Sequence, residues 1–388
     1  MPSSLETLLE RHLTLPELDY ETLTEIPSGL LAAFSKVPDP RRAQGRRYRC
    51  DWLLAIMACT IMTGQTGFRQ MCQTARRMKN PRKLPIPRPS TFHRFLARID
   101  PRTFEDILIS WAATLHPSSH PLLAEAISLD GKELRSAKHG NGTKTMLFAA
   151  CTHQTGMVLG QTRVTTKSNE IKALPELLEL LAKHYDLKGR VLTLDALHTQ
   201  RAAASLITEQ YGAHYVFTLK GNQPTLHTYI KDLPWEEVPV DDRTIDTSHG
   251  RVVIRELQLA TLGPGVAPDW PGLAQVGRLT RERTDQGKRS VETVYILTSL
   301  PTRLAGPATI ADLVRGHWSV ENRLHHVRDT TFNEDKNQVR TGHGAQNLAA
   351  LINVTLNAFR YLNLTEIRPT NTALHAQNNL IRGILQAI

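Results

Sequence analysis

The sequence predicts an α/β protein in which an all-helical, basic N-terminal region precedes a mixed sheet flanked by helices. Two observations lead to this fold class. The first 118 residues carry apolar side chains at helical spacing, such as Phe92, Phe95 and Ile99. From Pro121 onward, short apolar runs of strand length alternate with amphipathic helical stretches. A chain of 388 residues is long enough for two or three folded units with a sizeable core.

Composition favours a protein that meets a polyanion in the cytoplasm. The formal net charge is +10 and the pI is about 9.6, which makes nucleic acid the first candidate partner. The four cysteines show no CxxC spacing and are expected to be reduced thiols. The longest apolar run, at residues 52–62, is about half the length of a membrane span. We therefore expect no membrane association and no export, and a cytoplasmic location near the nucleoid.

Helix starts are expected at Ser90 and at Asp100, and arginine and lysine clusters lie around these helices. The clusters are Arg41, Arg42, Arg46, Arg47 and Arg49, followed by Arg76, Arg77, Lys79, Arg82, Lys83 and Arg88. A single run of this kind is usually a solvated surface. Two runs that flank short helices favour DNA binding by this region.

The second region follows a recognisable order of strands and helices. Expected strands lie at residues 126–129, 145–151, 158–164, 190–194 and 214–219, and expected helices at 169–184, 199–211 and 225–233. The order is strand, strand, strand, helix, strand, helix, strand, helix, with helical crossovers between parallel neighbours. This is the RNase H-like order, in which the first and fourth strands are adjacent.

A β-rich insertion is expected to interrupt this fold, because strand patterns at 252–259, 275–281 and 291–298 are separated by Gly and Pro. Helical pattern resumes at Thr309 and is expected to run through Glu321 toward Arg328. The predicted organisation is a helical DNA-binding domain at 1–118, the RNase H-like core at 119–234, the insertion at 235–305, helices completing the core at 306–365, and a tail at 366–388.

Two aspartates come at the ends of the strands that this order makes neighbours. Asp130 follows the first strand of the core and Asp195 follows the fourth. Carboxylates at adjacent strand ends face the cleft where an open α/β sheet binds its ligands. A third carboxylate from a later helix would complete a site for Mg²⁺ or Mn²⁺, which prefer oxygen ligands and accept phosphate oxygens as well. Two such ions suit phosphodiester chemistry.

Glu321 is the preferred third carboxylate, although Glu334 and Asp335 compete with it. His317, Glu321, His325 and Arg328 fall at helical spacing and are expected to share one face of one helix. An exposed polar stripe would show the same spacing. A rival hypothesis is a zinc or iron site formed by His317, Glu321 and His325, but that hypothesis leaves Asp130 and Asp195 without a role.

Several segments resemble the DDE transposases of bacterial insertion sequences, and in particular their H-repeat-associated branch. They are LDGKELRSA, KSNEI, LTLDALHTQ, YVFTLKGNQPTL, HGRVVIRE and HWSVENRLHHVRDTTFNED, in the order of the family. The segment LLAAFSKVPDPRRAQGRRYRCDWLLAIMACTIMTGQTGF also resembles the helical N-terminal domain of that branch. Six matches in order, covering nearly the whole chain, are specific.

The resemblance implies a role for individual residues. Asp130 of LDGK, Asp195 of LTLDA and Glu321 of HWSVEN would be the catalytic metal ligands, with two Mg²⁺ ions that Mn²⁺ can replace. A Tyr, Arg, Glu, Lys signature surrounds this glutamate in related transposases, and here its other positions are Val314, His317 and Arg328. The DNA contacts expected near the metals are Lys132, Lys220, Asn222, Gln223, Arg251, His317 and Arg328.

The function implied is DNA transposition. The enzyme would cut one strand at the terminal inverted repeats and use the freed 3′-hydroxyl to attack target DNA, as a homodimer on paired ends. Two alternatives remain at this point. One is a metal-dependent nuclease of the same fold without strand transfer, and the other is a catalytically silent, transposase-derived DNA-binding protein.

Overall fold

The computed structural model describes residues 29–77, 85–115, 125–138, 144–164, 170–247, 250–262, 270–364, 366–368 and 371–372. Within these ranges the helices are α3 (Cys50–Met62), α4 (Phe68–Arg77), α5 (Pro89–Leu96), α6 (Pro101–Leu115), α7 (Glu170–Ala182), α8 (Arg201–Ser205), α9 (Pro224–Lys231), α10 (Pro307–Gly316), α11 (His326–Thr330) and α12 (Gly344–Tyr361). Lys79, Arg82 and Lys83 of the second basic cluster, His249 of the HGRVVIRE segment and most of the 366–388 tail lie outside the described residues.

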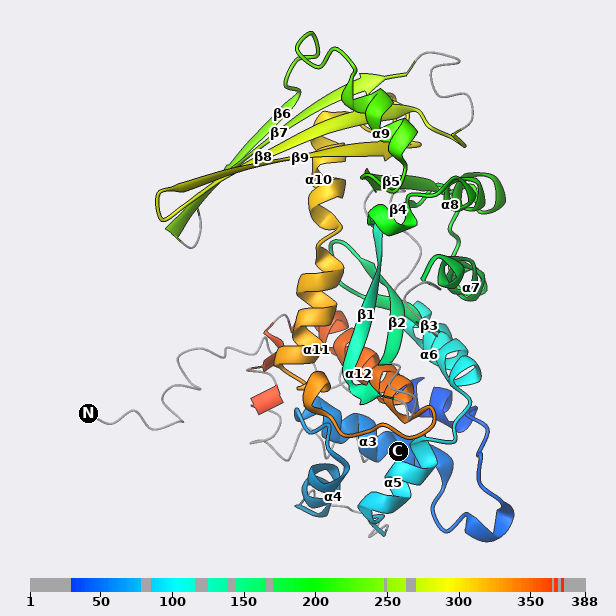
Figure 1. Cartoon of the computed structure of the whole chain (residues 1–388). Coiled ribbons are helices and arrows are strands. Elements are labelled where there is room, and N and C mark those ends of the chain that lie inside the picture. The colour runs from blue at the N-terminus through cyan, green and yellow to red at the C-terminus, as the bar shows by residue number, and fades with distance from the viewer. Residues whose placement is uncertain are drawn as a thin grey trace, which may run out of the picture.

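The strands form one mixed sheet, in the order β3-β2-β1-β4-β5-β9-β8-β7-β6. They are β1 (Ile127–Lys138), β2 (Lys144–Thr152), β3 (Val158–Val164), β4 (Val191–Leu194), β5 (His214–Leu219), β6 (Asp242–Asp246), β7 (Arg251–Thr261), β8 (Gln275–Asp285) and β9 (Lys288–Thr298). The first five follow the order that the sequence predicts. Strands β6 to β9 continue the same sheet beyond β5, because β9 pairs antiparallel to β5. The β-rich segment therefore extends the central sheet, at the upper end in Figure 1.

Both faces of the central strands are buried, and their residues alternate between two cores. In β4, Leu192 and Leu194 pack with α7 and α8, whereas Val191 packs with α10. Strand β5 alternates in the same way, with Phe217 on the first face and Val216 on the second. Successive side chains of a strand point to opposite faces, and parallel strands are buried on both. Figure 1 accordingly shows α7 and α8 on one side of the sheet and α10 on the other.

The register of β1 and β4 brings the two aspartates next to each other. These strands run parallel and pair Ile127 with Leu192 and Leu129 with Leu194. Asp130 and Asp195 are each the next residue after the last pair. The prediction that Asp130 ends its strand was wrong, because β1 continues to Lys138 by pairing with β2. Asp130 instead lies where β1 loses its neighbour β4.

The N-terminal helices and the C-terminal helix α12 share one hydrophobic core. The apolar run in α3 is buried there, together with Phe92, Leu351 and Phe359. Ser90 does not begin α5: the helix starts at Pro89, whose fixed φ suits a first helical position. Asp100 directly precedes α6, as expected for a residue that starts a helix, and its carboxylate accepts a hydrogen bond from the Thr103 amide at 2.9 Å. Within the described ranges, no helix combines the length and apolarity that crossing a membrane requires.

The helix expected to run without a break from Thr309 to Arg328 is interrupted. Helix α10 begins at Pro307 and ends at Gly316, a wider π-helical turn follows at Val320–His325, and α11 continues from His326. A π turn takes more residues than an α turn, so side chains beyond it rotate around the helix axis. His317 and Arg328 therefore do not share a face with Glu321. The Val320–His325 turn lies beside β1 and β2, whereas α10 lies higher in Figure 1, against β5, β6 and β7.

Arg328 is fully buried and holds the loop after α11 against the sheet. Its guanidinium donates to both carboxylate oxygens of Glu334 from Nε at 3.0 Å, and to Gln161 Oε1 at 3.2 Å. Asn333, with a left-handed φ of 50°, turns the chain so that Glu334 reaches this position. The expectation that Arg328 contacts DNA does not fit this geometry, because the side chain has no exposed surface.

We predict that Arg328→Ala unfolds the protein more easily and does not weaken DNA binding by the folded fraction. Removing one partner of a buried ion pair costs about 3–5 kcal/mol, since the other charge stays buried. Chemical denaturation measures this loss. In the Arg328→Ala/Glu334→Ala double variant the loss should be smaller than the sum of the two single losses. A single variant within about 1 kcal/mol of wild type would contradict the assignment.

Candidate active site

Among the described residues, one group of side chains has metal-ligand chemistry at close range: Asp130, Glu321 and His325. Their ligand atoms all lie within 4.8 Å of one another. His325 Nδ1 is 3.2 Å from Glu321 Oε2 and 3.5 Å from Asp130 Oδ2. The π turn places Glu321 and His325 on the side facing β1. Two predicted ligands are thus brought together by segments almost two hundred residues apart.

The charges in this group suit a cation. The hydrogen bond from His325 lowers the pKa of Glu321, so that Glu321 is a carboxylate at neutral pH. Burial lowers the pKa of His325, whose side chain is 3% exposed, so that the imidazole is neutral. Its other nitrogen, Nε2, is buried with no hydrogen-bond partner among the described residues. A neutral imidazole can offer a lone pair to a metal ion.

Asp195 approaches the same place from β4 but is not a member of the close group. Its carboxylate accepts a hydrogen bond from the Leu197 amide at 3.0 Å and caps the short helical turn Ala196–His198. Thr199, completely buried, donates to the Thr218 carbonyl at 2.6 Å and so ties this turn to β5. The half-buried Asp195 carboxylate is therefore held by a fixed turn that directly follows β4.

Buried hydroxyl groups attach the Glu321 helix to the two strands below the aspartates. Ser128 and Thr193 are paired across β1 and β4, two residues before Asp130 and Asp195. The Ser128 hydroxyl lies 3.1 Å from the Ser319 hydroxyl and donates to the Gly316 carbonyl at 3.3 Å. Because residues two apart share a face of a strand, these contacts set the helix on the same side as the aspartates.

Two histidines complete this junction through the Thr193 hydroxyl. It lies 2.9 Å from His153 Nε2 and 3.1 Å from His317 Nδ1. Burial lowers the pKa of both imidazoles, that of His153 to about 3, so both are neutral. A neutral hydroxyl between two neutral rings can donate to one and accept from the other. His317, predicted as a DNA contact, is thus engaged beneath Asp195.

The loop after β5 supports the turn that carries Asp195. Asn222 donates to the Ala196 carbonyl at 2.6 Å, and Gln223 donates to the Thr199 carbonyl at 3.1 Å. Both predicted DNA contacts therefore have a structural task at this edge of the sheet. Lys220, in the same loop, is exposed. Of the three, only Lys220 carries a charge, and it is open to solvent.

The remaining predicted contacts lie in different surroundings. Lys132 is buried, and its ammonium is 2.5 Å from Asp329 Oδ2, so it joins β1 to α11. Arg251 begins β7 in the sheet extension, opposite Asp285 of β8, and does not belong to the cleft. The structure thus brings Asp130 and Glu321 together, packs Asn222 and Gln223 against the turn that carries Asp195, and leaves Arg251 and Arg328 outside the site.

The two carboxylates that compete with Glu321 for the role of third ligand, Glu334 and Asp335, both pair with arginines. Glu334 pairs with Arg328 in the interior, and Asp335 lies 3.5 Å from the Arg135 guanidinium. The rival site of His317, Glu321 and His325 does not assemble, since His317 faces Thr193. The prediction of a single helical face included His325 but did not place it beside Asp130. The sequence did contain one indication that His325 lies at the site, because a residue four positions after Glu321 projects from the same side of a helix.

The fold is similar to that of a solved transposase structure. The chain superposes on the piggyBac transposase synaptic complex with hairpin DNA with a TM-score of 0.52, covering 96% of this chain and 82% of that one. The sequences are only 12% identical, so this likeness concerns the fold alone. It is consistent with the RNase H-like strand order described above.

The chain belongs to the DDE transposase family. The family model described as "Transposase DDE domain" matches residues 121–358, and the model described as "DDE_Tnp_1-associated" matches residues 31–112. Similar proteins include "Putative transposase YncI" of Escherichia coli O157:H7, 29% identical over 85% of this chain and 87% of that protein. "H repeat-associated putative transposase YhhI" of E. coli K12 is 28% identical over 84% and 89% of the two chains. The predicted family and its H-repeat-associated branch are confirmed.

We predict that Gly316→Ala disturbs the junction behind the aspartates. A Cβ at this position would lie 2.0 Å from His153 Nδ1, so the buried ring must move and lose its contact with Thr193. The expected cost is about 1–3 kcal/mol of stability. Thermal unfolding measures it. Gly306→Ala, at the other end of α10, is the matched control because a Cβ there meets no atom within 4 Å. Equal effects of the two variants would contradict the account.

Proposed function

We propose that this transposase cuts one DNA strand at the terminal inverted repeats of its insertion sequence and joins the freed 3′-hydroxyl to target DNA. Asp130, Asp195 and Glu321 are its catalytic carboxylates. The observation that carries the proposal is the convergence of Asp130 and Glu321 around His325 Nδ1, beside the turn that holds Asp195. Membership of the transposase family supports the class of reaction.

The residues present fit a divalent cation. Two carboxylates within 4.8 Å of each other, one of them with a lowered pKa, are hard oxygen ligands of the kind that Mg²⁺ and Mn²⁺ prefer. Asp130, Asp195 and Glu321 would hold two Mg²⁺ ions, which Mn²⁺ can replace. Bound there, the ions would lower the pKa of the attacking hydroxyl and neutralise charge on the phosphate. The buried imidazole of His325, whose Nδ1 lies beside both carboxylates, would supply a nitrogen donor that Mn²⁺ accepts more readily than Mg²⁺.

The protein contributes position and charge. The Ser128 and Thr193 hydroxyls keep the Glu321 helix in register with both aspartates. Asn222 and Gln223 keep the Asp195 turn closed. Catalysis of phosphoryl transfer depends mainly on such positioning together with electrostatic stabilisation. A shift of the Glu321 helix along β1 would separate the carboxylates even if all three were present.

DNA is the substrate on this proposal, both as element ends and as target. Lys220 is exposed in the loop that supports the Asp195 turn and would contact a phosphate. Two ends must be processed together, so the active form would be a homodimer on paired ends. Strand cleavage without joining would instead define a nuclease of the same fold, and intact bound DNA would define a DNA-binding protein without catalysis.

We predict that Asp130→Ala, Asp195→Ala and Glu321→Ala each abolish cleavage and joining of the element's own ends in Mg²⁺ while DNA binding persists. The expected loss exceeds about 100-fold, the upper range for residues that merely support metal ligands. Labelled duplex, resolved on denaturing gels, separates cut from joined products. Asp335→Ala is the matched carboxylate control and should retain activity, because Asp335 pairs with Arg135.

If Glu321→Ala kept full activity and Asp335→Ala lost it, the third metal ligand would lie in the segment after α11 and not at Glu321. A wild-type protein that cuts DNA but never joins it would exclude strand transfer and support a nuclease of the same fold. A wild-type protein that binds ends without cutting them in Mg²⁺ or Mn²⁺ would remove the enzymatic proposal altogether.

A further inference from the structure

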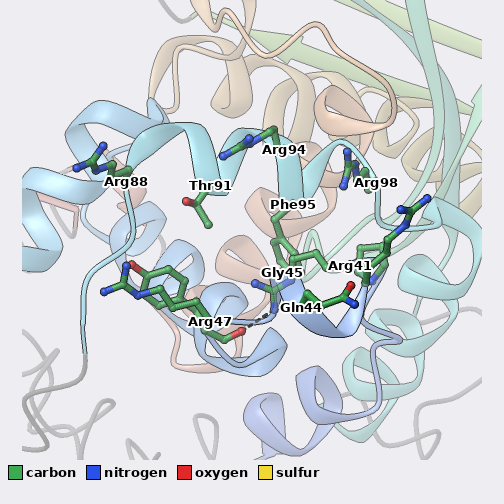
Figure 2. A pocket seen from close by; sticks show the side chains of 12 residues that line it. Arg41, Gln44, Gly45, Arg47, Arg88, Thr91, Arg94, Phe95 and Arg98 are labelled. Carbon is green, nitrogen blue, oxygen red and sulfur yellow. Dashed lines mark hydrogen bonds between the residues drawn. The ribbon is translucent and has the colours of Figure 1, made fainter.

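A groove lined by arginines lies in the N-terminal helical region, outside the carboxylate site. It has a volume of about 1100 Å³ and lies between residues 40–48 and helix α5. Half of the twelve residues that line it are arginines: Arg41, Arg42, Arg47, Arg88, Arg94 and Arg98. None of these twelve described residues is acidic. Figure 2 shows Arg88, Arg94 and Arg98 along one helix, opposite Arg47 and Gln44.

One of these arginines belongs to the framework of the groove. The Arg41 guanidinium donates to both oxygens of Asp39, at 2.8 and 2.7 Å, and to the Tyr48 carbonyl at 2.5 Å. It also lies over the Phe95 ring, 5.1 Å from the centroid. Arg41 thus fastens the segment of residues 39–48 to α5 and fixes the width of the groove.

The other five arginines keep their charge available. Arg42, Arg47, Arg88, Arg94 and Arg98 are all exposed and have no carboxylate partner among the described residues. Five unneutralised guanidinium groups around one hollow repel one another and raise the local positive potential. Such an arrangement is stabilised when a polyanion enters. Elsewhere on the surface, in β8 and β9, arginines pair with acids, as Arg281 does with Glu292.

The arrangement matches an extended chain of phosphates better than a single anion. Arg88 directly precedes α5, Arg94 lies within it and Arg98 follows it, so the row extends over the length of the helix and a residue or two beyond each end, about 15 Å at the rise of a helix. Thr91 lies between them on the same side. Planar guanidinium groups bind phosphate oxygens through two parallel hydrogen bonds. A row of this length spans several phosphates of a DNA strand.

The groove is rigidly connected to the catalytic half of the protein. Asn347 of α12 donates to the carbonyls of Leu96 and Ile99 at the end of α5, at 2.8 and 3.1 Å. The His343 amide donates to the Ala97 carbonyl at 3.1 Å. Helix α12 shares its core with Leu324 of the Glu321 segment. DNA held in the groove would therefore be fixed relative to the carboxylates.

We infer that this arginine-lined groove binds the sugar–phosphate backbone of duplex DNA, with Arg88, Arg94 and Arg98 as its phosphate contacts. The inference rests on the proposed function for the identity of the polyanion. It assigns the N-terminal region a defined DNA site, built from α5 and the segment of residues 40–48, that is separate from the cleft of Asp130 and Glu321.

The test uses the full chain and a fluorescein-labelled duplex of the element end in EDTA, so that binding is measured without cleavage. The Arg88→Ala/Arg94→Ala/Arg98→Ala variant is compared with Lys172→Ala/Lys183→Ala/Lys188→Ala, which removes equal charge from exposed positions in and after α7. We expect the arginine variant to bind at least about tenfold more weakly at physiological salt. Its slope of log affinity against log salt should fall by about 2–3, since each phosphate contact contributes about 0.9.

The lysine control should change affinity by less than about twofold, because a separated charge acts only through the screened general field. Circular dichroism establishes that both variants are folded. An arginine variant with the affinity and salt slope of wild type would overturn the inference, as would stronger binding of an RNA duplex of the same sequence to the groove. If wild type cuts and joins ends while the groove variant binds them unchanged, the proposed function stands and the groove fails. If the groove variant loses binding but wild type never cuts, the groove is a DNA-binding site and the proposed function fails.

Discussion

The candidate active site depends on two buried hydroxyl groups, those of Ser128 and Thr193. They are register partners in β1 and β4, and through them the turn between α10 and the Glu321 segment is attached to the sheet. Strand pairing alone brings Asp130 and Asp195 together. Glu321 comes from a separate helix, and nothing in the sheet register places it. Hydrogen bonds between buried polar groups are directional, and leaving one unmade costs about 1–3 kcal/mol, so they specify one position for the helix where apolar packing would allow sliding.

The π turn is the second condition for the site. A regular helix from Pro307 to Thr330 would carry His317, Glu321 and Arg328 on one face. The extra residue in the turn separates these three side chains. His317 contacts Thr193 of β4, Glu321 lies beside Asp130, and Arg328 is buried with Glu334. Irregular turns of this kind are frequent at functional sites, because they redirect one or two side chains without moving the helix. Here the turn leaves Glu321 and His325 at the cleft and buries Arg328 with Glu334.

Much of this could be predicted from the sequence, and the rest depends on contacts between distant segments. The adjacency of Asp130 and Asp195 follows from the order of apolar strands and helices, because parallel neighbours have their carboxyl ends together. The pairing of Arg328 with Glu334 was not predicted, since helical spacing describes a face and not what covers it. Lys132 and Asp329 are 197 residues apart in sequence, and no local pattern links them. Ser90 was assigned as a cap from its residue type, whereas Pro89 starts the helix.

The central claim is that Asp130, Asp195 and Glu321 hold divalent metal ions together. Anomalous diffraction from crystals of the protein with element-end DNA and Mn²⁺ tests it most directly, because Mn²⁺ scatters anomalously and accepts the ligands of Mg²⁺. The account predicts anomalous density between these three carboxylates, and its loss in Glu321→Ala. Density bound by Glu334 or Asp335, or none at the cleft while DNA is bound, would contradict it.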